Sequence, residues 1–241
     1  MSNPLTDKIA LVTGAGRGIG RAIGLALGTA GAHVVVAART QVEIDTVAQE
    51  IEQAGGTASA WPVDLSSEAE IAALFNVIRQ KFGRLDVLVN NAGIGLFGPL
   101  AEFASADLDR LYTINVRGTF LCCQQALKLM MPQASGTIIN ISSVVGFKGY
   151  ARQGGYTMTK HALMGLTKTL ALEAQPHGIR VSVISPGGVD TSMIGDARPD
   201  LDRSGLLQPE DIAQTVLFLL SLSEQAAIDE IYIRRRGSAP F

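Results

Sequence analysis

Seven short runs of mostly β-branched and other apolar residues recur along the chain, separated by longer segments with helical periodicity. The runs cover residues 9–13, 33–38, 58–63, 85–90, 136–141, 179–184 and 228–233. Within them apolar residues mostly follow one another instead of alternating with polar ones, which is typical of parallel strands covered on both faces. Between them, apolar positions recur at intervals of three and four over about 12 to 25 residues, as in amphipathic helices.

Capping and turn residues support this division into strands and helices. Ser67 precedes one helical segment and Gly83 follows it, while Pro209 begins the last helical segment. Strand–helix repetition of this kind favours right-handed crossovers and a parallel sheet. We therefore predict an α/β fold. Residues 1–241 form a single Rossmann-type doubly wound domain, with a seven-stranded, mostly parallel sheet flanked by helices on both faces.

The composition is that of a globular protein. Of the 241 residues, 47% are hydrophobic and 17% are charged, the formal net charge is −2, and the basic residues are scattered. This distribution argues against nucleic acid and anionic membrane as partners. No apolar run approaches the roughly 18 residues of a membrane span, and the N-terminus lacks the features of a signal peptide. The adjacent Cys122 and Cys123 are typical of buried thiols in a reducing compartment, so we expect a cytoplasmic protein.

A glycine-rich turn follows the first predicted strand and opens a helix. Glycines permit a tight turn and let backbone amides approach a pyrophosphate at the positive end of that helix. The alternative is a glycine-rich turn without a ligand, but a strand before it and a helix after it favour the phosphate site. The residues expected to contact a dinucleotide here are Gly14, Gly16, Arg17, Gly18, Ile19 and Gly20.

The spacing Thr-Gly-x-x-x-Gly-x-Gly, from Thr13 to Gly20, resembles the short-chain dehydrogenase/reductase family. Two further motifs share that resemblance, one after the third predicted strand and one after the fourth. The resemblance implies that Asp64, with Leu65, contacts the adenine of the cofactor, although Asp64 could instead cap the next helix. It also implies that a second segment stabilises the sheet beneath the cofactor, namely Asn90, Asn91, Ala92 and Gly93.

The end of the second predicted strand indicates which dinucleotide is bound. In dinucleotide enzymes an acid at this point holds the ribose 2′-hydroxyl, whereas an arginine accommodates a 2′-phosphate. This strand ends in Ala38, Arg39 and Thr40 and carries no acid. Arg39 offers a planar fork suited to phosphate, and Arg17 could reach the same group. The sequence therefore predicts NADP(H), with ordinary surface arginines as the alternative.

Tyr156 and Lys160 are four residues apart in a helical segment, so both project from one face of that helix. An ammonium about 4 Å from the phenol, at an effective dielectric constant near 20, would favour the phenolate by about 4 kcal/mol. That energy lowers the tyrosine pKa by roughly three units, toward the range where acid–base catalysis works. By itself the pattern is weak evidence, because such a pair usually belongs to an amphipathic helix face with its charge in solvent.

The family resemblance extends to a catalytic set of four residues. Ser143 ends the fifth predicted strand thirteen residues before Tyr156, which is the family's spacing, and Ser142 is the alternative. The resemblance implies that Ser143 binds the carbonyl oxygen and Tyr156 donates its proton. Lys160 would lower the tyrosine pKa and bind the nicotinamide ribose. Asn115 would hold a water for proton resupply, or alternatively bond its own helix backbone.

The segment after the sixth predicted strand is expected to border the nicotinamide and the substrate. By resemblance, a turn containing Pro186 and Gly187 lies beside the nicotinamide, Val189 and Thr191 border its carboxamide, and residues 187–208 form a substrate loop. The expected substrate residues are Ser143, Val145, Gln153, Tyr156 and Met193, joined by Ile94, Phe147 and Val189 in a mostly apolar pocket. The run Arg234, Arg235 and Arg236 could bind an acidic substrate, or be a solvated run or a subunit contact.

Together these features predict an NADP(H)-dependent oxidoreductase. It would transfer a hydride between the nicotinamide and a carbonyl or secondary alcohol, in a ketone, an aldehyde or a 3-oxo or 3-hydroxy compound, without a metal. One alternative is a non-catalytic NADP-binding sensor or scaffold. A second is an epimerase or dehydratase of the related extended families, which usually carry a larger C-terminal substrate domain. The resemblance further implies a homotetramer or homodimer.

Overall fold

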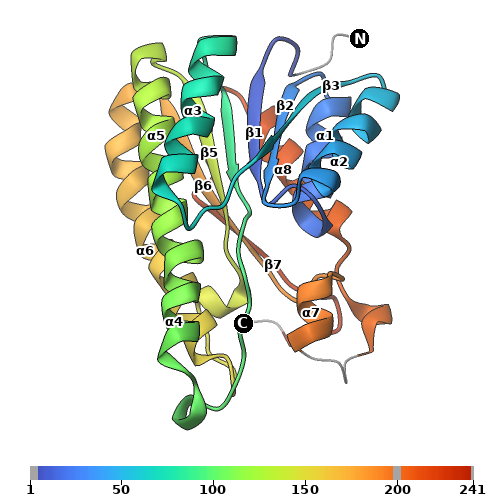
Figure 1. Cartoon of the computed structure of the whole chain (residues 1–241), viewed down its shortest axis with the longest axis vertical. Helices are drawn as coiled ribbons and strands as arrows, with labels where there is room; N and C mark the ends of the chain where they lie inside the picture. The colour runs from blue at the N-terminus through green and yellow to red at the C-terminus, as the bar shows by residue number, and fades with distance from the viewer. Residues whose placement is uncertain (1–4, 198–201, 240–241) are drawn as a thin grey trace.

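In the computed structural model, which describes residues 5–197 and 202–239, one seven-stranded sheet forms the centre of the molecule (Figure 1). Its strands are β1 Ile9–Thr13, β2 His33–Ala38, β3 Thr57–Pro62, β4 Val87–Asn90, β5 Gly136–Ile141, β6 Ile179–Pro186 and β7 Glu230–Ile233. The order across the sheet is β3-β2-β1-β4-β5-β6-β7. All six neighbouring pairs are parallel, so the predicted doubly wound fold is confirmed, with a sheet that is wholly rather than mostly parallel.

Helices cover both faces of this sheet, as predicted (Figure 1). One face carries α1 Gly18–Thr29, α2 Gln41–Gln53 and α8 Pro209–Ser221, and the other carries α3 Glu68–Phe82, α5 Thr119–Gln133 and α6 Gly154–Ala174. Successive strand residues belong to opposite layers of the core, since Ala10 and Val12 pack in the first layer while Ile9 and Leu11 pack in the second. Two-sided burial explains why the strands read as continuous apolar runs.

The strand order reverses between β1 and β4, which leaves a crevice at the carboxyl ends of these strands. The shorter helices α4 Ser105–Tyr112 and α7 Ser192–Ala197 lie toward that end of the molecule (Figure 1). Helix boundaries follow the predicted signals: the Ser67 side chain accepts from the Glu70 amide at the start of α3, and Gly83 ends that helix with a φ of 68°. None of the helices described is both long enough and apolar enough to cross a membrane.

Two features of the fold differ from the sequence prediction. Strand β3 lies at the edge of the sheet and is only partly buried, because it has a neighbour on one side alone. The predicted loop 187–208 is not irregular throughout, since it contains α7 and the short 3₁₀ turn Arg203–Gly205. Residues 198–201 of that loop lie outside the described part of the chain.

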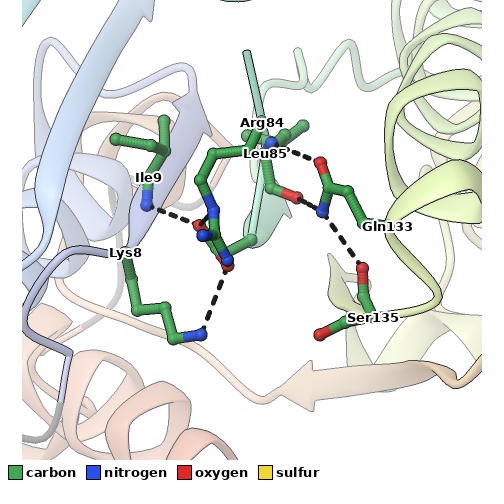
Figure 2. A network of polar contacts seen from close by, with 7 residues as sticks. Lys8, Ile9, Arg84, Leu85, Gln133 and Ser135 are labelled. Atoms are coloured by element: carbon green, nitrogen blue, oxygen red, sulfur yellow. Dashed lines mark hydrogen bonds and ion pairs between the residues drawn. The ribbon is translucent and has the colours of Figure 1, made fainter. Parts of the chain in front are cut away.

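A polar network joins β1, the residues just before β4 and the end of α5 (Figure 2). It lies at the amino-terminal ends of these strands, opposite the crevice at their carboxyl ends. The buried carboxylate of Asp86 accepts hydrogen bonds from the backbone N–H of Ile9 at 2.9 Å and from the Arg84 guanidinium, and it pairs with Lys8 at 3.4 Å. Beside it, the Gln133 amide bonds both the N–H and the C=O of Leu85. These contacts provide hydrogen-bond partners for backbone groups of Ile9 and Leu85, where β1 and β4 begin.

We expect Asp86→Ala to lower the free energy of unfolding by about 2–3 kcal/mol, because it leaves a buried N–H without an acceptor and two cations without a partner. Urea unfolding followed by circular dichroism measures the change. Asp107→Ala is the matched control, since Asp107 pairs with Arg110 at 3.1 Å on the surface and should contribute under about 0.5 kcal/mol. Equal losses in the two variants would contradict a stabilising role for the network.

Candidate active site

The glycine-rich turn between β1 and α1 brings backbone from two strands into close contact. Gly14 and Gly18 have φ values of +64° and +55°, in the left-handed region that favours glycine. A Cβ atom at Gly14 would lie 2.7 Å from the Cα of Ala92, and one at Gly20 would lie 2.3 Å from the carbonyl oxygen of Gly14. The turn therefore admits only glycine at these positions, and it exposes bare backbone toward the crevice.

Helix α1 presents its N-terminus to this crevice without an internal counter-charge. Its N-cap residue, Arg17, makes no side-chain capping bond, and the first turn contains no acidic residue. The first amides of any helix lack intrahelical partners and carry partial positive charge. This arrangement fits a pyrophosphate, as the sequence indicated.

The segment after β4 locks the turn in place. The amide nitrogen of Asn91 donates to the Thr13 hydroxyl, and its side-chain Nδ2 donates to the carbonyl oxygens of Thr13 and Gly14, each at 3.1 Å. Ala92 N–H also donates to the Thr13 hydroxyl. Asn91 is thus a positioning residue for the phosphate turn, consistent with the sheet-stabilising role that the family resemblance implied.

A cleft of about 400 Å³ runs along the carboxyl ends of the strands from Arg39 to Lys160. Of the residues expected to bind the cofactor, those that line it are Gly14, Gly16, Arg17, Gly18, Ile19, Arg39, Thr40, Asp64, Leu65, Asn91, Ala92, Gly93, Tyr156, Lys160 and Thr191. Gly20 is instead buried beneath the turn. Pro186, Gly187 and Val189 line a second cavity, described below, rather than this cleft.

The adenine-ribose end of the cleft contains an acid that the sequence analysis missed. Glu43, on the first turn of α2, lines the cleft beside Arg39 and forms an ion pair with Arg17 at 3.7 Å. A Cβ atom at Gly16 would lie 2.9 Å from the Glu43 carboxylate. Arg17 is therefore not an unpaired phosphate ligand, whereas Arg39 is exposed at the cleft. The only sequence signal for the role of Glu43 is its position, four residues after Arg39 and in the first turn of the next helix.

Asp64 lines the cleft but does not cap α3. Its Oδ1 accepts from the Ser66 amide at 2.8 Å, and its own amide donates to Glu70 at 2.8 Å, while Ser67 is the capping residue. The local turn holds the carboxylate in place at the cleft wall. The geometry therefore removes the helix cap as an alternative explanation of this residue.

Tyr156 and Lys160 project from α6 toward the crevice, as their four-residue spacing predicted. The Nζ atom of Lys160 lies 5.7 Å from the centre of the Tyr156 ring and donates to the carbonyl oxygen of Ile141 at 2.9 Å. Lys160 is buried, and this burial lowers its pKa to about 8. The ammonium is thus held at the end of β5 and readily gives up its proton.

The balance of effects on Tyr156 differs from the sequence prediction. Burial raises the pKa of Tyr156 to about 12, and a hydrogen bond with the Ser143 side chain lowers it only partly. The sequence prediction placed a full positive charge beside the phenol, whereas burial also disfavours the charge on Lys160 and so weakens its effect on the phenol. In this structure the tyrosine therefore holds its proton firmly.

The contact with Tyr156 distinguishes the two adjacent serines. The Ser143 side chain lowers the pKa of the Tyr156 phenol, and its Oγ accepts from the Val145 amide at 3.3 Å. Ser142 is buried, and its Oγ has no hydrogen-bond partner within the described ranges. Ser143 is therefore better placed for the role that the resemblance assigned to it.

Asn115 occupies an irregularity in the helix that the sequence did not reveal. It lies in a π-helical segment, Thr113–Gly118, between α4 and α5. Its Oδ1 accepts from the Ile94 amide at 2.8 Å, and its Nδ2 donates to the Ile94 carbonyl at 2.9 Å and to the Thr159 hydroxyl at 3.2 Å. The side chain thus bonds a neighbouring segment rather than its own helix, and it ties the segment after β4 to α6.

A second cavity of about 230 Å³ adjoins the first. The two share Tyr156 together with Ile19, Ser142, Thr191 and Met193. Six of the eight residues expected in the substrate pocket line the second cavity, namely Ser143, Val145, Gln153, Tyr156, Val189 and Met193. Phe147 is instead exposed, packing edge-on against Tyr232 at 6.2 Å, and Ile94 lines the first cleft.

Comparison with known proteins agrees with this geometry. The family model described as short chain dehydrogenase matches residues 8–202. The chain is 37% identical over 230 residues to an uncharacterised oxidoreductase of Staphylococcus aureus (strain USA300), covering 95% of this chain and 98% of that protein. The chain belongs to the short-chain dehydrogenase/reductase family. It is thus an oxidoreductase of a family that uses a nicotinamide cofactor, as the sequence indicated.

Solved short-chain dehydrogenase/reductase structures superpose over nearly the whole chain. A metagenomic short-chain oxidoreductase in complex with NADP is 36% identical with a TM-score of 0.87, covering 98% of this chain and all of that one. An alcohol dehydrogenase from the archaeon Thermococcus sibiricus, complexed with 5-hydroxy-NADP, is 30% identical with a TM-score of 0.90, covering 97% and 99%. The similarity therefore includes both the phosphate turn and the region around Tyr156.

Proposed function

We propose that this chain is an NADP(H)-dependent oxidoreductase that interconverts a small carbonyl compound and the corresponding alcohol. The observation that carries the proposal is the place of Tyr156 at the junction of the two cavities. One cavity begins at a phosphate turn and ends at Tyr156 and Lys160, while the other brings Ser143 to the same phenol. A dinucleotide in the first and a small molecule in the second would meet at a proton donor.

When bound, the nicotinamide supplies the hydride for reduction or accepts it in the reverse direction. Ser143 orients the carbonyl oxygen, and the Tyr156 hydroxyl donates its proton to that oxygen as negative charge develops there. Lys160, whose pKa burial lowers to about 8, hands a proton back to the phenolate. Asn115 acts as a positioning residue, since its amide fixes Ile94 and Thr159 on either side of the site.

The cofactor's 2′-phosphate is assigned to Arg39. Strand β2 ends without an acid, Arg39 is exposed at the cleft, and two solved relatives are complexes with NADP or a derivative of it. Glu43 disfavours the 2′-phosphate, because its carboxylate pairs with Arg17 and would repel the negative charge of that phosphate. The proposal is therefore a preference for NADP(H) over NAD(H) that the negative charge of Glu43 reduces.

The non-catalytic sensor remains the second candidate, and the complete set of Asn115, Ser143, Tyr156 and Lys160 at one site counts against it. Assembly into a tetramer or dimer and a cytoplasmic location belong to the same proposal. Exposed apolar side chains on α5 and α6 support assembly, namely Phe120, Met131, Met158 and Leu172. Seven of the fifteen residues of α5 are buried in the core, which limits the area that this helix offers to a partner.

Titration with NADPH and NADH, followed by nicotinamide fluorescence and then by a panel of ketones, aldehydes and 3-oxo esters, tests the function. We expect Arg39→Ala to weaken NADPH binding about tenfold or more, since it removes a charge-assisted contact, with little change for NADH. Glu43→Gln should act in the opposite direction and strengthen NADPH binding. Tighter NADH than NADPH binding in the wild type would overturn the cofactor assignment, and binding without turnover on any carbonyl would favour the sensor.

A further inference from the structure

The second cavity has a positively charged wall. Among its lining residues in the described part of the chain, Lys148, Arg234 and Arg235 carry positive charge and none is an aspartate or glutamate. The chain as a whole contains slightly more acidic residues, 22, than lysines and arginines, 20. A wall with cations alone is therefore a local departure from the average surface, in the same cavity as Ser143 and Tyr156.

The fold builds the C-terminal segment into this wall. The amide of Gly187 donates to the carbonyl of Ile233 at 2.6 Å, and a Cβ atom at Gly187 would lie 3.5 Å from the Cα of Arg234. Arg234 then closes the following turn, because its Nη1 donates to three backbone carbonyls, the nearest that of Ser238 at 2.7 Å. Arg234 is thus a positioning residue that shapes the segment carrying Arg235.

Arg235 and Lys148 are the two cations that remain available to a ligand. Arg235 is half-buried, and its Nε donates to the Ser238 hydroxyl at 3.1 Å, which orients the guanidinium. No residue in the described ranges accepts a hydrogen bond from either of its Nη groups. Lys148 lies 5.9 Å above the ring of Tyr232, another residue of the wall. Within residues 5–197 and 202–239, no carboxylate forms an ion pair with either cation.

We propose that the substrate carries a carboxylate, bound by Arg235 and Lys148, while its carbonyl group faces Ser143 and Tyr156. The inference rests on the proposed function and names the substrate class for that site. A planar guanidinium that offers its Nη groups matches a carboxylate in geometry and charge. The cavity of about 230 Å³ suits a short oxo acid, since it is smaller than the usual site of a drug-sized ligand.

The test compares oxo acids with their methyl esters, which keep the carbonyl and remove the charge. The probes are 2-oxobutanoate, 3-oxobutanoate and 4-oxopentanoate, each with its ester, in steady-state NADPH oxidation at low ionic strength. We expect at least one acid to exceed its ester about tenfold in kcat/KM. Arg235→Gln should lower kcat/KM for that acid roughly 10- to 100-fold and for the ester only two- to threefold.

Arg236→Gln is the matched control, because Arg236 is exposed, belongs to the same run and does not line the cavity. It should leave the preference for the acid unchanged. Esters reduced as well as acids throughout the series, or equal losses for acid and ester in Arg235→Gln, would overturn this inference while leaving the proposed function intact.

Thermal unfolding with the same probes separates the two proposals if none of them is reduced. An acid that raises the unfolding temperature of the NADPH-bound wild type, but not of Arg235→Gln, would support the carboxylate site and count against the proposed reaction. Equal shifts with acid and ester would overturn the carboxylate site. The shift produced by an acid should shrink as salt is added, because screening weakens an accessible charge contact.

Discussion

Tyr156→Phe is expected to reduce turnover of any carbonyl substrate by about a thousandfold while leaving NADPH binding within two- to threefold of wild type. The phenol lies at the junction of the two cavities, and acid–base catalysis by a positioned group contributes roughly 10²- to 10⁴-fold. Fluorescence titration gives the cofactor affinity and steady-state kinetics give the rate, so the two effects are measured separately.

The substitution should preserve the fold. The Tyr156 ring packs edge-on against Phe97 with ring centres 5.6 Å apart, and phenylalanine keeps that contact. Tyr150→Phe is the matched control, since Tyr150 lines the same cavity with an exposed side chain outside the proposed catalytic set. It should change kcat/KM by less than about threefold. A Tyr156→Phe variant with most of its activity would assign the proton to another group.

The architecture could be predicted from the sequence because strands buried on both faces appear in it as uninterrupted runs of apolar residues. Residues 34–38 of β2, for example, are all apolar, since the strand is covered from both sides. The glycine-rich turn could also be predicted, because a side chain at Gly14 or Gly20 would collide with backbone where β1, α1 and the segment after β4 meet. The strand at β3 was predicted correctly, but its expected burial was not found, because a missing neighbour on one side leaves this strand partly exposed.

Features that depend on distances between elements could not be predicted. Glu43 and Arg17 belong to different helices, and only the packed structure brings their charges within 3.7 Å. Lys148 and Arg235 likewise line one cavity although they lie far apart in the sequence. The pKa of Tyr156 followed burial rather than the neighbouring cation, and no spacing rule measures burial.

The same burial yields a prediction about stability. Burial lowers the pKa of Lys160 from its ordinary value of 10.5 to about 8, so the folded state disfavours its charge. Below pH 8 both the folded and unfolded states hold the proton, and the full cost, about 3 kcal/mol, opposes folding. Between pH 8 and 10.5 the unfolded state binds more protons than the folded state, so stability rises with pH and the cost disappears.

Lys160→Met should therefore lose about 10²- to 10⁴-fold in kcat, as expected when proton return to Tyr156 fails, yet be more stable than the wild type at pH 7. Methionine fills much of the space without a charge, although the Ile141 carbonyl loses its donor, so we expect a net gain of about 1–2 kcal/mol. For a chain of this length, each kcal/mol of added stability raises Tm by roughly 2–4 °C. Thermal unfolding at pH 7 and pH 10 measures it.

The pH dependence of the difference distinguishes this cause from better packing. The advantage of Lys160→Met should shrink by pH 10, because the wild type no longer carries a buried charge there. Lys168→Met, at an exposed position on the same helix, provides the control and should show no such dependence. A stability gain of Lys160→Met that does not change with pH would point to better packing. A variant less stable than wild type at pH 7 would show that the hydrogen bond of the ammonium stabilises the fold by more than its desolvation costs. The expected result would instead mean that the chain accepts lower stability to keep a deprotonatable lysine beside Tyr156.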